Sequence, residues 1–146
     1  MRTLTAGIGT LICFAITATP PSRANQAPEQ ARLGGVCSTP GSARMRTTIY
    51  FGLMQRTGWV TESQWKTFLR QEVTRRFPDG LTVWEADGQW RKQSGRIARE
   101  RSKVLLLVHE DTATVRKSLA DIVTSYKRSF QQESVLWESA PVCAAF

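Results

Sequence analysis

Alternating or unbroken runs of apolar residues predict strands in four parts of the chain. In the first, Ile49 and Phe51 fall on one face and Tyr50 falls on the other. The run Val104–Val108 is apolar throughout, which is typical of an interior strand covered on both faces. Residues 92–95 read as a hairpin turn between the second and third strands. The predicted strands comprise residues 47–53, 81–91, 97–109 and 134–138.

Apolar residues at every third or fourth position predict two helices. Thr61 and Gln64 form a capping box at the start of the first helix, and Pro78 restricts the residue before it and ends that helix. Asp111 or Thr112 caps the second helix. The apolar stripes comprise Trp65, Phe68, Leu69, Val73 and Phe77 in the first helix, and Val115, Leu119, Ile122, Val123, Tyr126 and Phe130 in the second.

The order of these elements is strand, helix, strand, strand, helix, strand. This β-α-β-β-α-β order is the split βαβ pattern of ferredoxin-like folds. We therefore expect an α+β domain in which a four-stranded antiparallel sheet carries two helices on one face. In this architecture the first and third strands are central, and the fourth strand lies antiparallel beside the first.

The sheet face without helices raises the question of what covers it. By parity we expect this second face to gather Tyr50, Trp84, Leu105, Leu107 and His109. So many apolar groups on an open face predict a partner surface. We expect a homodimer packed sheet to sheet, as in dimeric α/β barrels, with an apolar ligand as the alternative.

The first residues predict export. Arg2 precedes an apolar stretch at residues 4–18, which is too short to span a bilayer comfortably, and small residues follow it up to Ala24. We expect residues 1–24 to be a signal peptide, 25–46 a flexible leader and 47–146 the folded domain. The mature protein would then be periplasmic or secreted, with no transmembrane segment.

Export changes the chemistry expected of the two remaining cysteines, Cys37 and Cys143. An oxidising compartment favours pairing of Cys37 with Cys143 over a metal site or a nucleophile. The predicted topology supports this disulfide, because the end of the fourth strand should lie beside the beginning of the first. In the chain-entropy model, closing this loop would stabilise the fold by roughly 4 to 5 kcal/mol.

The chain is basic, and its positive charge bears on which kinds of anionic partner it could bind. Without Arg2 and Arg23, which the signal peptide would remove, 18 basic and 12 acidic residues remain. Export argues against nucleic acid, and the sequence has no helix-turn-helix, zinc-finger or aromatic-basic RNA motif. The charge could serve solubility alone or attract anionic polymers and lipids of the cell envelope.

Several motifs resemble a family of exported bacterial proteins known only as a domain of unknown function. They include TTIYFGL, RFPDGLTV, GQWR and SKVLLLVH, and the likeness covers roughly residues 37–146. The resemblance implies a small periplasmic or lipid-anchored α+β domain and carries over no catalytic residue. A lipid-attachment motif of related chains is not found here. The positions that the family often preserves are Gln89, Trp90, Arg91, Ser102, Lys103, His109, Glu133 and Ser134.

A basic cluster at one end of the sheet is the favoured binding site. Arginine forks there could hold a carboxylate, a phosphate or a sugar acid. A solvated hairpin tip that carries charge for solubility is an equally open interpretation. The candidate ligand-binding residues are Arg56, Arg91, Arg96, Gln89, Trp90 and Glu133.

Catalytic chemistry has weaker candidates. His109 is the only imidazole and would need an orienting carboxylate, whereas a histidine bonded to a backbone group is the simpler expectation. Ser102 and Lys103 are adjacent in a strand and point to opposite faces, so they cannot form a dyad. One histidine and scattered carboxylates favour no metal site, and no cofactor is expected.

These observations favour a non-catalytic binding module for an anionic ligand or an envelope component. The alternative is a small enzyme of the dimeric α/β barrel type, either an isomerase or a cofactor-independent oxygenase. Its pocket would lie on the second sheet face and be lined by Tyr50, Trp84 and His109. Whether the protein is an enzyme is left open by the sequence.

Overall fold

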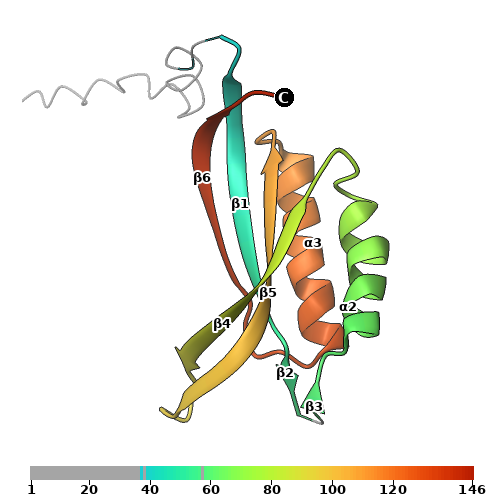
Figure 1. The fold of residues 1–146 in the computed structure, drawn as a ribbon, viewed down its shortest axis with the longest axis vertical. Helices are drawn as coiled ribbons and strands as arrows, with labels where there is room; N and C mark the ends of the chain where they lie inside the picture. Colours follow the sequence, from blue (N-terminus) through green and yellow to red (C-terminus); the bar gives the residue numbers. More distant parts are fainter. Residues whose placement is uncertain (1–36, 38, 57) are drawn as a thin grey trace, which may run out of the picture.

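The computed structural model describes residues 37, 39–56 and 58–146. It is an α+β fold with two layers, a four-stranded antiparallel sheet and two helices that cover one face of it (Figure 1). The predicted fold class is confirmed. The predicted signal peptide and most of the predicted leader lie outside the described residues.

The strand order in the sheet is β4-β5-β1-β6, so β5 and β1 are central and β6 lies antiparallel beside β1, as the split βαβ pattern predicts. The four strands are β1 (Ser42–Gly52), β4 (Thr82–Arg91), β5 (Ile97–His109) and β6 (Leu136–Ala144).

Two strand boundaries differ from the prediction by several residues. β1 begins at Ser42, so residues 42–46 belong to the sheet although the sequence places them in a flexible leader. β6 runs from Leu136 to Ala144, further than the expected end near residue 138. The two extensions pair with each other, from Ser42 opposite Ala144 onward. Backbone pairing holds these residues in the sheet, and their few large apolar side chains give only a weak strand pattern.

The first predicted helix consists of two segments. α2 (Glu62–Phe68) is capped by Thr61, whose side chain accepts from the Gln64 backbone while the Gln64 side chain accepts from the Thr61 backbone, which confirms the capping box. It continues as the π-helical segment η1 (Leu69–Thr74). The second helix, α3 (Ala113–Ser129), is capped by Thr112.

A small hairpin, β2 (Met54–Gln55) and β3 (Gly58–Trp59), connects β1 to α2. Val60 follows it and donates its backbone N–H to the Leu53 carbonyl oxygen at 2.8 Å. This hydrogen bond returns the chain to the end of β1 before α2 begins.

The core lies between the sheet and the helices. Aromatic rings of β1, α2 and α3 meet there, and the centroids of Phe51 and Tyr126 are 4.6 Å apart. The fully buried members include Ile49, Phe51, Val73, Leu105, Ile122 and Tyr126.

The predicted composition of the second sheet face is partly wrong. Thr47 pairs with Leu107 and Ile49 with Leu105, so Leu105, Leu107 and His109 share the helix-covered face with Ile49. Tyr50 and Trp84 do lie on the open face, where they flank Val104. An unbroken apolar run has no alternation, so the sequence leaves the register of β5 undetermined, and a shift of one residue exchanges the two faces.

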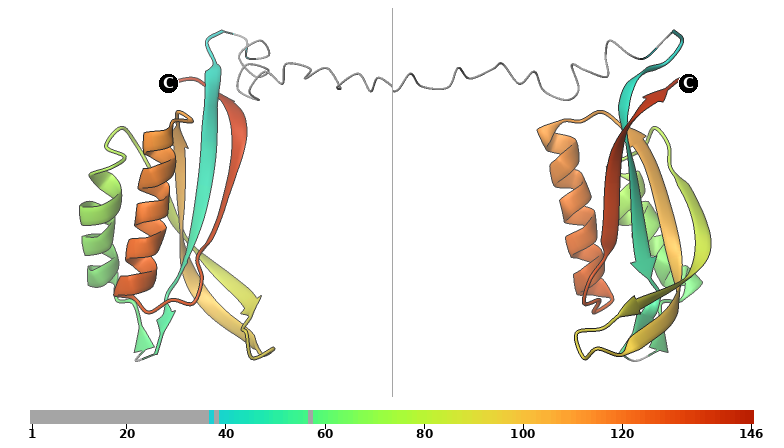
Figure 2. Two further views of the ribbon diagram at one scale, coloured as in Figure 1. Left: turned by 180° about the vertical axis from the view of Figure 1, so that it is seen from behind. Right: turned by 90° about the vertical axis from the view of Figure 1, so that its left-hand side faces the viewer.

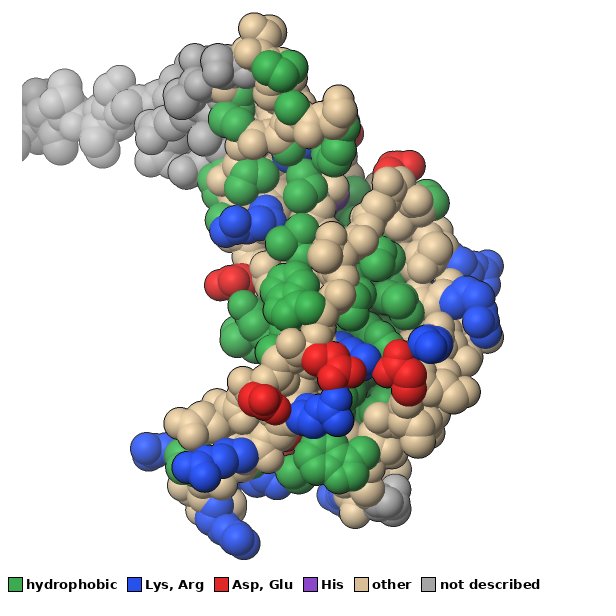
Figure 3. Space-filling view, viewed as in Figure 1, with side chains coloured by type: hydrophobic (Ala, Val, Ile, Leu, Met, Phe, Trp, Pro, Cys, Tyr) green, Lys and Arg blue, Asp and Glu red, His purple; other side chains and the backbone are tan. Residues whose placement is uncertain are grey.

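The two ends of the sheet differ in construction. Beyond the end of β1, the β4–β5 hairpin continues on its own and curls away from the helices (Figure 2). At the opposite end Cys37 and Cys143 form the predicted disulfide, with their Cα atoms 5.5 Å apart. Cationic side chains gather at the hairpin tip, and the surface above the tip is hollowed (Figure 3).

Candidate functional site

Two cavities flank the β4–β5 hairpin. The first, which we call the hairpin cavity, has a volume of about 490 Å³ and is lined by Trp59, Asp87, Gly88, Gln89, Arg99, Glu100 and Arg101. The second, the sheet cavity, has a volume of about 190 Å³ and is lined by Tyr50, Gly52, Gly88, Gln89, Trp90, Glu100, Ser102, Ser134 and Leu136. The two cavities therefore share Gly88, Gln89 and Glu100.

The hairpin cavity depends on the strand register. Gln89 lies directly opposite Arg99, and Asp87 lies opposite Arg101. Trp59 of β3 forms the other wall and leaves 51% of its surface exposed. Arg101 pairs with Glu85, whereas Arg99 has no carboxylate partner within the described part of the chain. A guanidinium beside an amide therefore faces this cavity.

Further cations surround the hairpin cavity. Arg56, Arg91 and Arg96 are exposed, and none of them forms an ion pair with a described residue. Arg56 lies in the β2–β3 hairpin, at the same end of the sheet as the β4–β5 tip (Figure 1). The stretch from residue 86 to residue 102 holds five cationic residues and two acidic ones. This end of the molecule is therefore positively charged.

The sequence-predicted ligand residues are only partly brought together. Gln89 lines both cavities and Trp90 lines the sheet cavity. Arg91 and Arg96 lie on the hairpin outside the two sets of lining residues, and Arg56 lies in the smaller hairpin. Glu133 is exposed beside Ser134, which lines the sheet cavity.

The sheet cavity contains a fixed carboxylate that the sequence analysis did not single out. The Oε2 atom of Glu100 accepts a hydrogen bond from the Met54 backbone N–H at 3.2 Å. A Cβ atom at Gly52 would lie 2.7 Å from Oε1 of Glu100, so only glycine leaves room for this carboxylate. The one available signal was Gly52 itself, because glycine in a strand often marks the close approach of another group.

A buried hydrogen bond fixes the end of β1 behind Glu100. The hydroxyl of Tyr126 donates to the Gly52 carbonyl oxygen at 2.8 Å and is buried among the core rings. Burial raises the pKa of Tyr126, and the negative charge of Glu100 raises it further. The phenol therefore stays protonated and holds the end of β1 in place.

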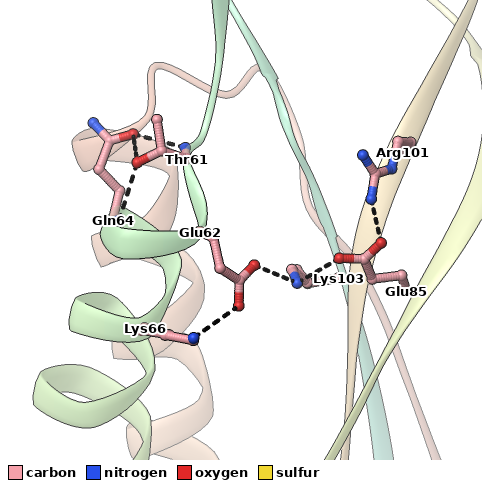
Figure 4. Close-up of polar contacts among 7 residues, drawn as sticks. All are labelled: Thr61, Glu62, Gln64, Lys66, Glu85, Arg101 and Lys103. Carbon is pink, nitrogen blue, oxygen red and sulfur yellow. Dashed lines mark hydrogen bonds and ion pairs between the residues drawn. The ribbon is translucent and has the colours of Figure 1, made fainter.

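Lys103 lies on the other face of β5 from Ser102, as the strand parity predicts. Its ammonium donates to Glu62 of α2 and to Glu85 of β4, each at 2.7 Å, and Lys66 and Arg101 extend this network (Figure 4). Burial opposes the charge of Lys103, but the hydrogen bonds to both carboxylates outweigh it and raise the pKa of Lys103. The network joins α2 to the β4–β5 hairpin.

The imidazole of His109 makes hydrogen bonds that differ from those of a catalytic base, which would need an orienting carboxylate. Its Nδ1 atom is 2.8 Å from the Glu110 carbonyl oxygen, which can only accept, so Nδ1 carries a proton. Its Nε2 atom lies 2.8 Å from the hydroxyl of the buried Thr47. The imidazole is therefore bonded to a backbone group, which is the simpler of the two expectations.

The single pocket expected from Tyr50, Trp84 and His109 does not form. His109 lies on the helix-covered face, whereas Tyr50 and Trp84 lie on the open face. His109 instead borders a separate cavity of about 520 Å³, which Arg44, Arg76 and Phe77 also line. The predicted pocket is wrong for the same reason as the predicted positions of Leu105 and Leu107, because the sequence leaves the register of β5 undetermined.

Two searches of the described residues bear on membrane and metal binding. Across residues 37, 39–56 and 58–146, no helix is long and apolar enough to cross a membrane. Within the same ranges, no cluster of three or more histidine, cysteine, aspartate or glutamate side chains could hold a metal ion.

Solved structures with a similar fold are distant in sequence. A phage SAM lyase in complex with S-methyl-5'-thioadenosine is 14% identical, with a TM-score of 0.54 over 70% of this chain and 90% of that chain. The phage SAM lyase in the apo state is 12% identical, with a TM-score of 0.50 over 71% and 90% of the two chains. At such identity the likeness shows the fold alone.

A weaker structural match is the periplasmic divalent cation tolerance protein CutA from Archaeoglobus fulgidus. It is 6% identical and has a TM-score of 0.45, covering 68% of this chain and 83% of that chain. No curated protein matches the sequence. The family described as "Protein of unknown function (DUF3574)" matches residues 46–146, and the chain therefore belongs to this family.

Proposed function

We propose that this protein is an exported binding module that holds a small anionic ligand in the hairpin cavity. The observation that carries the proposal is Arg99, a cavity-lining guanidinium that lies opposite the Gln89 amide and has no carboxylate partner among the described residues. Guanidinium and amide groups together recognise carboxylates and phosphates through directed N–H donors.

The surrounding charge supports the same ligand class. Arg56, Arg91 and Arg96 raise the local concentration of anions around the cavity mouth. Asp87 and Glu100 also line the cavity and repel an anion, which restricts its place to the side of Arg99 and Trp59. The aromatic wall then contacts the less polar part of the ligand.

Export is part of the proposal and is supported by the disulfide, since such bonds form and persist in oxidising compartments. A signal peptide cleaved after Ala24 would give a mature chain that begins at Asn25. Mass spectrometry of the protein from the extracytoplasmic fraction tests this cleavage. A protein found only in the cytoplasm with Met1 retained would contradict it.

We also propose that two copies pack through the open sheet face. Trp84 leaves 43% of its surface exposed there, and the helices cover only the opposite face. Sedimentation velocity should detect a dimer that Trp84→Glu converts to a monomer, because the new charge would be buried at the interface. A wild-type monomer at high protein concentration would exclude this arrangement.

The binding proposal is tested with variants matched in charge. A site variant replaces Arg91, Arg96 and Arg99 by glutamine. The control replaces Arg70, Arg75 and Arg128, which are exposed on the helical layer and form no ion pair with a described residue. Titration calorimetry with citrate and with inorganic phosphate should show at least about a tenfold loss of affinity in the site variant alone.

Equal losses in both triple variants would mean general charge attraction and would refute a defined site. Vesicles containing phosphatidylglycerol form a second arm of the experiment. If vesicles bind and neither citrate nor phosphate does, the partner is an anionic membrane surface and the small-ligand proposal is wrong.

A further inference from the structure

Glu100 is held in the sheet cavity with one oxygen atom uncommitted. Its Oε2 atom accepts from the Met54 N–H, whereas Oε1 lies over Gly52, and Glu100 forms no ion pair with any described residue. A carboxylate fixed in a cavity with an open acceptor position favours a hydrogen-bond donor, above all a cationic one.

The other groups of the sheet cavity suit the same partner. Within the described part of the chain, the side chains of Ser102 and Ser134 make no hydrogen bond. Each has an oxygen atom that can accept. Tyr50 and Trp90 supply aromatic rings, whose negative faces attract a cation. An ammonium group has three N–H donors, which matches a carboxylate with neighbouring hydroxyl oxygens.

We infer that the sheet cavity binds a primary ammonium group, so that the ligand of this protein carries both an amine and an anion. The anionic half of this inference rests on the proposed function, whereas the ammonium half rests on Glu100 and the groups around it in the sheet cavity. The two cavities share Gly88, Gln89 and Glu100, so the proposed anion and ammonium sites are neighbours on the β4–β5 hairpin. The sheet cavity, at about 190 Å³, admits only a small amine.

Four probes of similar size separate the two charges. Butanol carries neither charge, butyrate carries the anion, butylamine carries the ammonium, and 4-aminobutyrate carries both. Binding is followed by NMR shifts of the Trp59 and Trp90 indole N–H groups, which report on the hairpin cavity and the sheet cavity. The wild type should bind 4-aminobutyrate at least about ten times more tightly than butyrate.

Two variants remove or displace the carboxylate. Glu100→Gln keeps an oxygen atom that can accept from the Met54 N–H, so the hairpin stays in place. Gly52→Ala adds a methyl group where Oε1 now lies and moves the carboxylate. In both variants the affinity for 4-aminobutyrate should fall to that for butyrate, while butyrate binding does not weaken. Glu72→Gln on η1, which removes one half-buried charge that pairs with Arg76 far from the hairpin, is the control.

The outcomes of this experiment separate the two proposals. If butyrate and 4-aminobutyrate bind the wild type equally and Glu100→Gln changes neither, the ammonium site is refuted and the anion site stands. If butyrate does not bind but butylamine binds and is lost in Glu100→Gln, the anion proposal fails and the ammonium site stands. If none of the charged probes binds more tightly than butanol, both are wrong.

Discussion

Lys103 shows how one residue can link three elements. Its side chain is only 9% exposed, yet it carries a charge because Glu62 and Glu85 accept hydrogen bonds from its ammonium group. Hydrogen bonds from Lys103 and then Arg101 lower the pKa of Glu85. The folded state therefore favours the ionised carboxylate and the protonated amine.

Replacing Lys103 by methionine should destabilise the fold by about 1 to 2 kcal/mol near neutral pH, because two carboxylates lose their donor. The sign of the pH dependence follows from the lowered pKa of Glu85. Its stabilising effect is present above the ordinary carboxyl pKa and is lost as pH falls through the folded value. Acidification should therefore cost the wild type more stability than Lys103→Met, as measured by urea unfolding.

Lys66→Met is the control for this experiment, because Lys66 is exposed and lies 3.8 Å from Glu62 at the outer end of the same network. It should unfold like the wild type at each pH. Equal acid sensitivity of the wild type and Lys103→Met would show that the Lys103 contacts do not stabilise the ionised form of Glu85.

Single residues of the site were predictable to different degrees. The disulfide followed from cysteine count and topology, and Gln89 and Trp90 from the family resemblance. The contact of Glu100 with Gly52 was not predictable, because it joins residues of two strands whose register the sequence leaves undetermined. The sequence pattern around Glu100 also does not distinguish this carboxylate from any other charged residue of the hairpin.

At the scale of elements, the capping box of α2 was readable from the sequence because all its atoms lie within four residues. Replacing Thr61 by alanine should cost about 1 kcal/mol of stability, since the Gln64 backbone N–H loses its acceptor. Ser63→Ala, one residue inside the helix, is the matched control and should change stability little. Equal unfolding midpoints for the two variants in urea would show that the cap contributes nothing.

The π-helical segment and the strand faces depend on tertiary contacts and could not be predicted from the sequence. The apolar stripe of the first helix fits ordinary helical spacing, yet residues 69–74 are π-helical and the Thr74 hydroxyl donates to the Leu69 carbonyl oxygen. The limits of β4 and β5 were predicted to within one residue, whereas the faces of β5 were exchanged. Strand limits are set by local turn residues, but faces are set by pairing with β1.

At the scale of the whole molecule, the disulfide and the candidate site lie at opposite ends of the sheet. Replacing Cys37 and Cys143 by serine should lower the free energy of unfolding by about 4 kcal/mol, because the bond closes a long loop in the unfolded chain. Its two cysteines are 106 residues apart. The affinity for citrate should be unchanged below the unfolding transition, as calorimetry can measure.

If the serine variant unfolds at the same urea concentration as the wild type, the disulfide does not stabilise the fold. If it stays folded but no longer binds citrate, the disulfide end of the sheet affects the candidate site at the other end. That result would contradict the independence of the two ends.

The central claim, an anion held at Arg99, is tested most directly by a citrate titration of the isotope-labelled protein followed by NMR. The account predicts saturable shifts of the Trp59 indole, the Gln89 side-chain amide and the Arg99 Nε–H, with the backbone of α3 unchanged. Shifts centred instead on Arg70 of η1 and on Arg75 after it, or no saturable shift at the hairpin, would contradict it.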